Sequence, residues 1–483
     1  MTDSNWTRRS ILTGLAGGAA SFLGAADRPP NIVFLLLDDL GWRDFGCYGN
    51  SLHETPNVDH LAAEGVRFTN AYAACPVCSP TRASIMTGKY PARLHLTDWI
   101  AGRKQWPTSR LLVPPFEQQL PLAETTVAEA LQPLGYRSAS IGKWHLGGEG
   151  FWPEQQGFDV NVAGYHRGSP PAFFGPFDMP NLKGGTKDDW LTEKLTDAAE
   201  KFIEDSARDR KPFFLYLPEY TVHLPLQARQ EVTARYRAKI GNHDFPNAIY
   251  AAMVDSFDVA LGRIRAKLND LGIAGETAIF ITSDNGGLRY EGRSKNAVTT
   301  NAPLRAGKGH LYEGGIREPL IVHWPGVTRP GTVIDEPVSS VDYLPTIVEM
   351  AGGRAPRPPA IDGVSLTGLL RGRSTAPNRD ALYWHYPHYS NQGGVPGGAV
   401  RQGDWKLIEF YEDSRLELFN LRDDPGETRN LVRKEAKVAA RLHRMLRDWR
   451  KKAKATMPEP NPAYDPAKAD QGLTGVEPAT EPV

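Results

Sequence analysis

The chain has 483 residues, of which 40% are hydrophobic and 10% aromatic, and 56 Lys+Arg balance 56 Asp+Glu for a formal net charge of +0 at pH 7. A neutral chain lacks the broad basic field that nucleic acid or an anionic membrane surface would select, so we expect neither as a partner. The composition is that of a globular protein long enough for more than one domain.

The pattern of residues 1–26 is typical of an export signal. Arg8 and Arg9 precede a short apolar stretch, and small residues at Gly24 and Ala26 suit signal cleavage. The stretch is too short and too rich in glycine to span a bilayer, so we expect no stable membrane insertion. A twin-arginine-type signal implies the twin-arginine export machinery as a partner and a periplasmic or extracellular location in a bacterium.

Four short apolar runs, each followed at once by polar residues, predict the buried strands of a parallel sheet. They are residues 31–37, 136–141, 212–217 and 277–282. Helical patterns at residues 127–135 and 251–272 supply crossovers between them. The expected fold is α/β, a doubly wound, mostly parallel central sheet flanked by helices. Ligands bind outside the carboxyl ends of such strands, where all four polar clusters would lie.

A stretch rich in Pro, Gly and Arg at residues 352–363 predicts a linker. Beyond it, VRQGDWKLIEF and RLELFNL indicate a pair of strands, and a helix follows with apolar positions at Val438, Leu442, Met445 and Trp449. We therefore predict a small C-terminal α+β subdomain, an antiparallel sheet plus a helix. The expected boundaries are 1–26 for the signal peptide, 30–351 for the N-terminal catalytic domain, 352–380 for the linker, 381–455 for the subdomain and 456–483 for an unstructured tail.

Two pairs of oxygen-bearing side chains follow two of the predicted strands. Asp38 and Asp39 come directly after the first strand, and Asp284 and Asn285 follow the last one. Three carboxylates and one amide oxygen suit a hard cation, Ca²⁺ before Mg²⁺, and lack the sulfur and imidazole that zinc prefers. A bare Asp-Asp pair is more often a cap or a turn, and the second pair is what favours a metal site.

The stretch from Cys78 to Arg82, CSPTR, resembles the C-x-P-x-R signature of the type I sulfatase family in the alkaline phosphatase superfamily. In that family the cysteine is oxidised to formylglycine (3-oxoalanine). Further similar blocks follow the family's order, namely DDLG, GKWHLG, SDNGG and LRAGKGHLYEGGIREP, with a related C-terminal stretch. The resemblance covers most of residues 30–450. It points to bacterial secreted enzymes of the arylsulfatase A-like and N-acetylgalactosamine-sulfatase-like kinds.

The resemblance implies a ligand set and a catalytic set. The metal ligands would be Asp38, Asp39, Cys78, Asp284 and Asn285. The catalytic residues would be Cys78, Arg82, Lys143, His145, His223 and Lys308. In this scheme the hydrate of formylglycine is the nucleophile, Asp284 accepts its proton, and Arg82 holds the hydrate. The modification implies a formylglycine-generating maturation enzyme as a partner.

The remaining roles fall to two lysines and two histidines. Lys143 and Lys308 would neutralise the sulfate oxygens, and His223 would protonate the departing oxygen. His145 would remove the second hydroxyl proton so that sulfate is expelled. Most lysines are solvated and most histidines lie in the core or on the surface. Both of these lysines have glycine neighbours, however, His145 lies in a glycine-bounded block after one predicted strand, and His223 lies before a proline after another.

The stretch of residues 89–106 carries groups that recognise sugars. Asp98 and Arg103 suit hydroxyls or a second anion, Trp99 suits a sugar ring face, and His166 is a further candidate from another loop; simple packing is an equal alternative. The wording RLHLTDWIAG is similar to bacterial sulfatases that act on sulfated galactose or N-acetylgalactosamine, particularly at the 4-position. Other residues that could complete the pocket are Trp106, Trp152, Trp384 and His385.

The predicted function is a sulfuric ester hydrolase that removes sulfate from a sulfated carbohydrate with formylglycine and Ca²⁺. A formylglycine-dependent phosphonate or phosphate monoester hydrolase, a general arylsulfatase and a non-catalytic sulfoglycan-binding relative are the alternatives. Phosphatases of the superfamily use Ser or Thr and usually a second metal, whereas Lys143, His145 and Lys308 suit a monoanionic sulfate ester. Of the other cysteines, Cys47 and Cys75 could pair in an oxidising compartment, leaving Cys78 as the odd thiol.

Overall fold

The computed structural model describes residues 29–107, 109–240, 247–289, 298–356 and 358–467. The predicted export signal, residues 1–26, lies outside these ranges. Among the described residues, none of the helices combines the length and the apolar character needed to cross a membrane.

The larger sheet contains nine strands among the described residues, and most of them run parallel, as the apolar runs predict. Strand β10 (Arg317–His323) is antiparallel to both of its neighbours, and the short β12 (Val338–Ser339) pairs with the end of β2 (Val66–Tyr72). Across the sheet the strands are β11 (Thr332–Ile334), β2 (Val66–Tyr72), β10 (Arg317–His323), β9 (Thr277–Ser283), β1 (Asn31–Leu37), β8 (Phe213–Pro218), β4 (Arg137–Ile141) and β5 (Val160–Val162), with β12 at Val338–Ser339.

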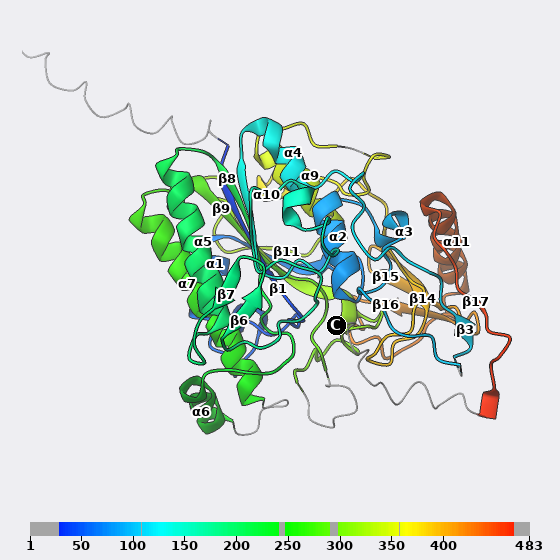
Figure 1. The fold of residues 1–483 in the computed structure, drawn as a ribbon. Helices are drawn as coiled ribbons and strands as arrows, with labels where there is room; N and C mark the ends of the chain where they lie inside the picture. Colours follow the sequence, from blue (N-terminus) through cyan, green and yellow to red (C-terminus); the bar gives the residue numbers. More distant parts are fainter. Residues whose placement is uncertain (1–28, 108, 241–246, 290–297, 357, 468–483) are drawn as a thin grey trace, which may run out of the picture.

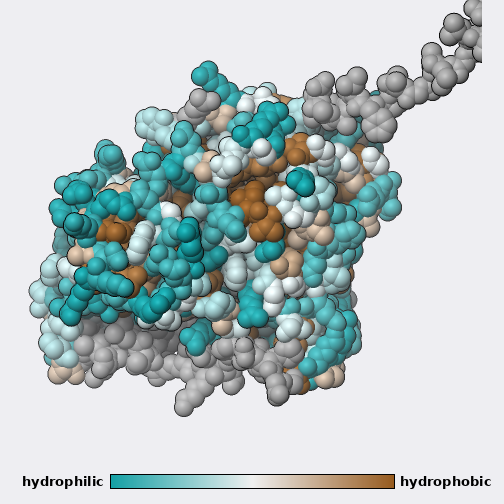
Figure 2. Space-filling model, turned by 180° about the vertical axis from the view of Figure 1, so that it is seen from behind, coloured by the Kyte–Doolittle hydropathy of each residue, from teal (hydrophilic) through white to brown (hydrophobic). Residues whose placement is uncertain are grey.

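Helices cover both faces of this sheet (Figure 1). One face carries α1 (Pro56–Glu64), α5 (Leu191–Arg208) and α7 (Ala248–Asp270), and the other carries α2 (Cys78–Thr87), α4 (Val127–Leu131), α9 (Tyr343–Met350) and α10 (Thr367–Leu370). The doubly wound prediction is therefore confirmed. The reverse side of the molecule is mostly hydrophilic with separate hydrophobic patches, as expected where helices bury one side only (Figure 2).

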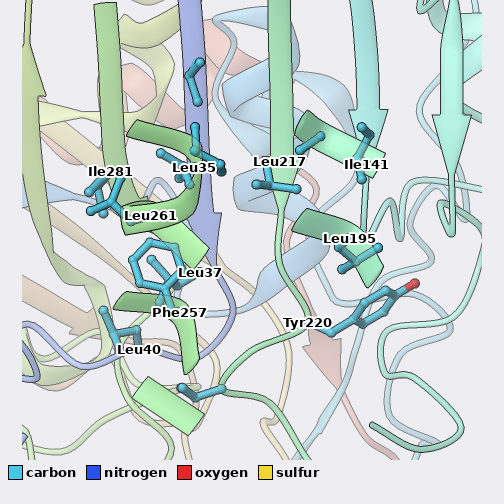
Figure 3. Close-up of a cluster of buried hydrophobic side chains, with 14 of the residues drawn as sticks. Leu35, Leu37, Leu40, Ile141, Leu195, Leu217, Tyr220, Phe257, Leu261 and Ile281 are labelled. Carbon is cyan, nitrogen blue, oxygen red and sulfur yellow. The ribbon is translucent and has the colours of Figure 1, made fainter. Parts of the chain in front are cut away.

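Strand β1 shows why a continuous apolar run forms the centre of the sheet. Its side chains alternate between the faces, so Leu35 and Leu37 join the cluster with α5 and α7, while Phe34 joins the cluster with α2 and α9. Figure 3 shows Leu35 and Leu37 beside Phe257 and Leu261 of α7. Each of these residues is fully buried. If polar residues alternated with apolar ones along this strand, one of its faces would be polar, and the hydrophobic effect would not favour burying that face under helices.

A second, antiparallel sheet with one helix follows, as predicted for the C-terminal subdomain (Figure 1). Its elements are β13 (Leu382–Tyr386), β14 (Gly397–Gln402), β15 (Trp405–Phe410), β16 (Leu416–Asn420) and α11 (Ala436–Ala453). Leu442 of α11 packs on Val400 and Leu407 of the sheet. The segment VRQGDWKLIEF forms two strands rather than one, because Gly403 has φ 56° and turns the chain between Gln402 and Trp405.

Two other expectations need correction. The predicted unstructured tail is wrong for its described part, since β17 (Glu459–Pro460) pairs with β3 (Leu111–Leu112). Cys47 and Cys75 are free rather than paired. They belong to different hydrophobic clusters, Cys47 beside the α1 and α7 face and Cys75 beneath the C-terminal sheet, and this separation keeps the thiols apart.

The two sheets are joined by a buried ion cluster. Lys406 of β15 is fully buried and lies 2.9 Å from both Glu313 Oε1 and Glu427 Oε1. Tyr72 of β2 donates a hydrogen bond of 2.7 Å to Glu313 Oε2. The cluster thus fixes the start of α8 (Glu313–Ile316) between the two sheets. A buried charge needs such partners, because desolvation otherwise disfavours its charged form.

We predict that Lys406→Met lowers the free energy of unfolding by about 3–5 kcal/mol, because it removes the cation that lies 2.9 Å from both buried carboxylates and leaves Glu313 only the more distant Arg317, at 3.6 Å. Urea denaturation at pH 7 measures this. Lys451→Met, the same change on the exposed side of α11, serves as the control and should cost far less. Adding Glu427→Gln to Lys406→Met should recover part of the loss, and equal losses in Lys406→Met and Lys451→Met would contradict the assignment.

Candidate active site

The polar residues that follow four strands meet at one edge of the larger sheet. The Lys143 ammonium, after β4, lies 2.7 Å from Asp38 Oδ2, after β1. Asp284, after β9, accepts a hydrogen bond of 3.2 Å from the Asp39 amide. His223, beyond β8, places Nε2 3.6 Å from Asp39 Oδ2. The four chain segments therefore form one site at the carboxyl ends of the parallel strands, where ligand sites are expected in such sheets.

An acidic cradle forms the base of this site. Asp38, Asp39, Asp284 and Asn285 are all buried, and Asn285 donates a hydrogen bond of 2.8 Å to Asp39 Oδ1. Asp39 has φ 62°, a left-handed conformation that side chains with a Cβ rarely adopt. Such strain persists only where the surroundings fix it, and it clusters at functional sites. Here it lets two successive carboxylates point into the same cluster of polar side chains.

The cradle fits a divalent cation. Asp38 Oδ1 and Asn285 Oδ1 are buried and have no hydrogen-bond partner, although native proteins pair nearly all such atoms. Oxygen atoms of Asp38 and Asp39 and a ring nitrogen of His223 lie within 4.8 Å of one another. Burial, with Asp284 and Asp39 nearby, raises the pKa of Asp38 to about 7 although Lys143 opposes it. A cation would satisfy both oxygens and lower that pKa.

Three cations balance the three carboxylates. Arg82 donates from Nε to Asp284 Oδ2 at 2.8 Å and from Nη1 to the Lys143 carbonyl at 2.8 Å. Lys308 lies 2.7 Å from Asp39 Oδ1 and 2.8 Å from Asp39 Oδ2. Burial lowers the pKa of Lys308, but Asp39 outweighs it and keeps that pKa above its usual value, so the side chain stays charged. Because these charges cancel, a bound divalent cation would give the site a net positive charge and so attract an anion.

Cys78 begins helix α2 and is 3% exposed. Its Sγ lies 3.4 Å from His145 Nδ1. Thr81 Oγ1 donates to the carbonyls of Cys75 and Val77, at 2.9 and 3.2 Å, and so shapes the turn that leads into the helix. Burial raises the pKa of the Cys78 thiol in spite of Lys143 and Lys308. An unmodified Cys78 is therefore a protonated thiol, the less reactive form.

His145 has a fixed tautomer. Its Nε2 lies 2.5 Å from the Ile100 carbonyl, which only accepts, so Nε2 carries the proton and Nδ1 offers a lone pair to residue 78. Burial, helped by Lys143, lowers the pKa of His145 well below its usual value. Gly168 covers the imidazole, since a Cβ there would lie 2.5 Å from Cε1. A neutral, oriented imidazole beside residue 78 is suited to accept a proton.

His223 is arranged differently. Its Nδ1 donates to the Leu224 carbonyl at 3.0 Å, which leaves Nε2 as the ring nitrogen on the side of Asp39. Burial, followed by Lys308, lowers the pKa of His223 to about 3, with Asp39 opposing. The free site therefore holds His223 neutral at pH 7. To act as an acid it needs a bound anion nearby that raises its pKa.

The four candidate substrate residues lie in different surroundings. Asp98 is buried and accepts hydrogen bonds from Tyr386 Oη at 3.0 Å and from the Trp99 amide at 2.9 Å, so it anchors a loop. Trp99 is partly buried against the cluster beneath the C-terminal sheet. Arg103 is half-buried, and His166 is exposed. Of these four, Arg103 and His166 offer polar side chains that are accessible to a ligand.

Two further sequence candidates are part of the core. Trp384 is buried and donates from its indole to the Ala73 carbonyl at 2.8 Å. His385 is buried between Tyr411 Oη and the Thr456 carbonyl. The sequence missed Ile100, which acts through its backbone, and Gly168, which acts by having no side chain. No pattern of side-chain types could have indicated either residue.

The chain is similar to proteins of known family. The family described as Sulfatase matches residues 30–353, and the one described as N-sulphoglucosamine sulphohydrolase, C-terminal, matches residues 306–452. Arylsulfatase A of Homo sapiens is 34% identical over 88% of this chain and 86% of its own length. A protein named Sulfatase from Formosa agariphila is 32% identical over 88% and 89%.

Two further likenesses concern carbohydrates. N-acetylgalactosamine-6-sulfatase of Homo sapiens is 35% identical over 83% of this chain and 81% of its own length. Among solved structures, Ps i-CgsB in complex with k-i-k-neocarrahexaose superposes with a TM-score of 0.75 and 26% identity, over 92% of this chain and 96% of that one.

We predict that Ca²⁺ stabilises the metal-stripped protein, by about 2.7 kcal/mol at 100 times the dissociation constant, because it binds the folded cradle and not the unfolded chain. The thermal unfolding midpoint after EDTA treatment, with and without added Ca²⁺ or Mg²⁺, measures this. Asp38→Asn should remove most of the shift, whereas Asp423→Asn, at the exposed first residue of another Asp-Asp pair, should retain it. No shift with either cation would contradict the metal site.

Proposed function

We propose that this chain, which belongs to the sulfatase family and is a sulfuric ester hydrolase, removes sulfate from a sulfated carbohydrate with a formylglycine made from Cys78. The observation that carries the proposal is the meeting of Cys78, a neutral His145 and two lysines above an oxygen-lined cradle. Each of these groups has a use in cleaving an anionic ester. The same edge of the sheet supplies all of them.

Cys78 is better suited to be a precursor than a nucleophile. Its thiol stays protonated because burial raises its pKa, and neither nearby lysine reverses this. Its neighbour Nδ1 of His145 remains an acceptor for a hydroxyl proton. Once formed and hydrated, formylglycine would supply an oxygen nucleophile and a second hydroxyl group through which the enzyme is regenerated.

The chain's own residues would then handle charge and protons. Lys143 and Lys308 are fixed by Asp38 and Asp39 and can hold the sulfate oxygens as charge spreads over them. His145 Nδ1 would take a proton from residue 78. His223 would give a proton to the departing sugar oxygen once the bound sulfate has raised its pKa.

The cradle would hold the divalent cation, with Ca²⁺ proposed before Mg²⁺ because its donors are oxygens. Asp38, Asp39, Asp284 and Asn285 would bind it together with residue 78. The cation would supply positive charge that lowers the pKa of a nearby hydroxyl and attracts the substrate anion. Arg82 would keep Asp284 ionised and in place for this task.

For the sugar, we propose a galactose or N-acetylgalactosamine residue with sulfate at the 4-position. Relatives named N-acetylgalactosamine-6-sulfatase support the sugar class and name a different ring position. Arg103 and His166 are the accessible polar groups that would contact the sugar or a second anion. We further propose export by the twin-arginine route to the periplasm or beyond, with maturation before export.

We predict that the tryptic peptide of residues 68–82 from native protein carries an aldehyde or its hydrate at position 78. Cys78→Ala should fold and lose turnover, since it removes the nucleophile and leaves the buried strands unchanged. Cys78→Ser should fail as a multiple-turnover enzyme, because a serine ester of sulfate has no second hydroxyl to expel the sulfate. Peptide mass and steady-state kinetics measure these outcomes. An unmodified thiol in fully active native protein would contradict the proposal.

We predict that kcat/KM for 4-O-sulfated galactose or N-acetylgalactosamine oligosaccharides exceeds that for the 6-O-sulfated isomers by at least about tenfold, because a site aligned for one ring position leaves polar groups unpaired with the other. Sulfate release from a matched pair of isomers measures the ratio. The corresponding phosphate and phosphonate monoesters are the controls. Preference for those esters would favour the phosphonate or phosphate hydrolase instead.

A further inference from the structure

A strand near the end of the chain closes over the loop that carries Arg103. We name residues 99–107 the recognition loop and residues 459–461 the clasp. We propose that the clasp holds the recognition loop in place for catalysis and that Asn461 is a positioning residue of the reaction. This rests on the proposed function, in which Arg103 contacts the sugar.

The first end of the recognition loop is fixed by the site itself. The Ile100 amide donates to Ser79 Oγ at 3.1 Å, and its carbonyl receives the proton of His145 Nε2. Just before it, Asp98 accepts from Tyr386 Oη of β13. These three contacts tie the loop to the nucleophile helix, to the catalytic histidine and to the C-terminal sheet. They do not depend on the clasp.

The other end of the loop is fixed by the clasp. Asn461 is 9% exposed, and its Nδ2 donates to the carbonyls of Pro107 and Ser109, at 3.1 and 2.7 Å. Its backbone amide donates to the Arg110 carbonyl at 3.0 Å. Its Oδ1 accepts from the Ala463 amide at 3.0 Å. Both amide protons of one side chain are thus used to hold backbone carbonyls at and beyond the end of the loop.

Strand pairing adds to the contacts that the clasp makes. Pro460 lies opposite Leu111 and Glu459 opposite Leu112, so β17 covers the edge of β3. The Leu111 amide also donates to Tyr389 Oη at 3.2 Å. The end of the recognition loop is therefore held between the C-terminal sheet and the last described segment of the chain. A ladder of two residue pairs stabilises this contact only weakly, so the hydrogen bonds of the Asn461 side chain contribute most to holding the end of the loop.

Arg103 lies between the two fixed ends and is linked to the catalytic lysine through Ser390. Its Nη1 donates to the Ser390 carbonyl at 3.5 Å, and its guanidinium faces the rings of Trp106 and Tyr389 at 5.7 and 5.9 Å. Ser390 in turn packs so closely on Gly309, the residue after the sulfate-binding lysine, that a Cβ on this glycine would lie 1.9 Å from Ser390 Oγ. The position of Arg103 relative to that lysine therefore depends on a loop fixed at both ends.

This arrangement separates two effects. Release of the clasp loosens Arg103 and its neighbours, while the contacts of Ile100 keep His145 in place. Binding of an extended sugar should weaken, and cleavage of a small ester that needs only the sulfate site should not. A purely structural role for Asn461 would instead lower stability without separating the two substrates.

The test compares Asn461→Asp and a chain that ends at Pro458 with the full parent chain. Asn461→Asp keeps the Oδ1 acceptor and the size but removes both donors that hold the loop. Asn430→Asp is the matched control, because Asn430 also uses Nδ2 on a carbonyl, that of Leu416, and Oδ1 on the Leu418 and Val432 amides, all within the C-terminal subdomain.

Two readouts are taken, trypsin cleavage after Arg103 and Lys104 mapped by mass spectrometry, and kinetics on a sulfated oligosaccharide and on 4-nitrophenyl sulfate. We expect both clasp variants to be cut in the loop at least about tenfold faster, as loss of two hydrogen bonds implies. The oligosaccharide KM should rise at least about fivefold, with kcat for the small ester within about twofold of the parent. Asn430→Asp should match the parent in all of these.

The inference is overturned if Asn461→Asp is cut no faster than the parent, if Asn430→Asp changes equally, or if the oligosaccharide KM is unchanged once the loop is released. If kcat for the small ester fell by the same factor as kcat/KM for the oligosaccharide, the idea that the two ends of the loop are fixed independently would be overturned. If the parent hydrolyses neither compound, the proposed function fails. The cleavage rates would still decide whether the clasp holds the loop.

Discussion

The active site depends on one buried guanidinium. Arg82 is fully buried on α2, and its Nε and Nη2 both lie 2.8 Å from Asp284 Oδ2 at the end of β9. Its Nη1 holds the Lys143 carbonyl after β4, and the other oxygen of Asp284 accepts from the Asp39 amide after β1. One side chain thereby sets the distance between the helix that carries Cys78 and three strand ends. A lysine could not replace it, because only a planar fork with several donors reaches two partners at once.

The same contacts explain why so many charges can be buried together. Three carboxylates face three cations inside one buried cluster, so each charge has a partner at hydrogen-bond distance and the desolvation cost is offset in part. Hydrogen bonding in the cluster is incomplete, however, because Asp38 Oδ1 and Asn285 Oδ1 have no hydrogen-bond partner. The left-handed backbone at Asp39 and at His145, with φ 62° and 57°, is the conformational cost of aiming these groups inward. A preorganised site of this kind needs little rearrangement when an anion binds.

The parts of the structure that the sequence predicts are those in which side chains carry the information. The continuous apolar run of β1 and the polar residues after it indicated a buried strand and a ligand site, and residues 38, 39, 284 and 285 do converge. Backbone-mediated features escaped prediction. Ile100 works through its carbonyl, β17 contains a proline and only two residues, and the turn at Gly403 splits one predicted strand into two. Aromatic and histidine residues also mislead when burial decides their role, as for Trp384 and His385.

In the proposed function, chemistry and recognition are placed on different parts of the fold. The larger sheet supplies the carboxylates, the lysines and both histidines, whereas the recognition loop is anchored mainly from the C-terminal side. Tyr386 holds Asp98, Ser390 holds Arg103, and Asn461 holds the far end of the loop. Because Lys406 links the sheets at a separate point, changes in the loop anchors need not disturb the cradle. Under the proposed function, the C-terminal subdomain can therefore alter which sugar is bound while the buried ion network that would carry out cleavage stays the same.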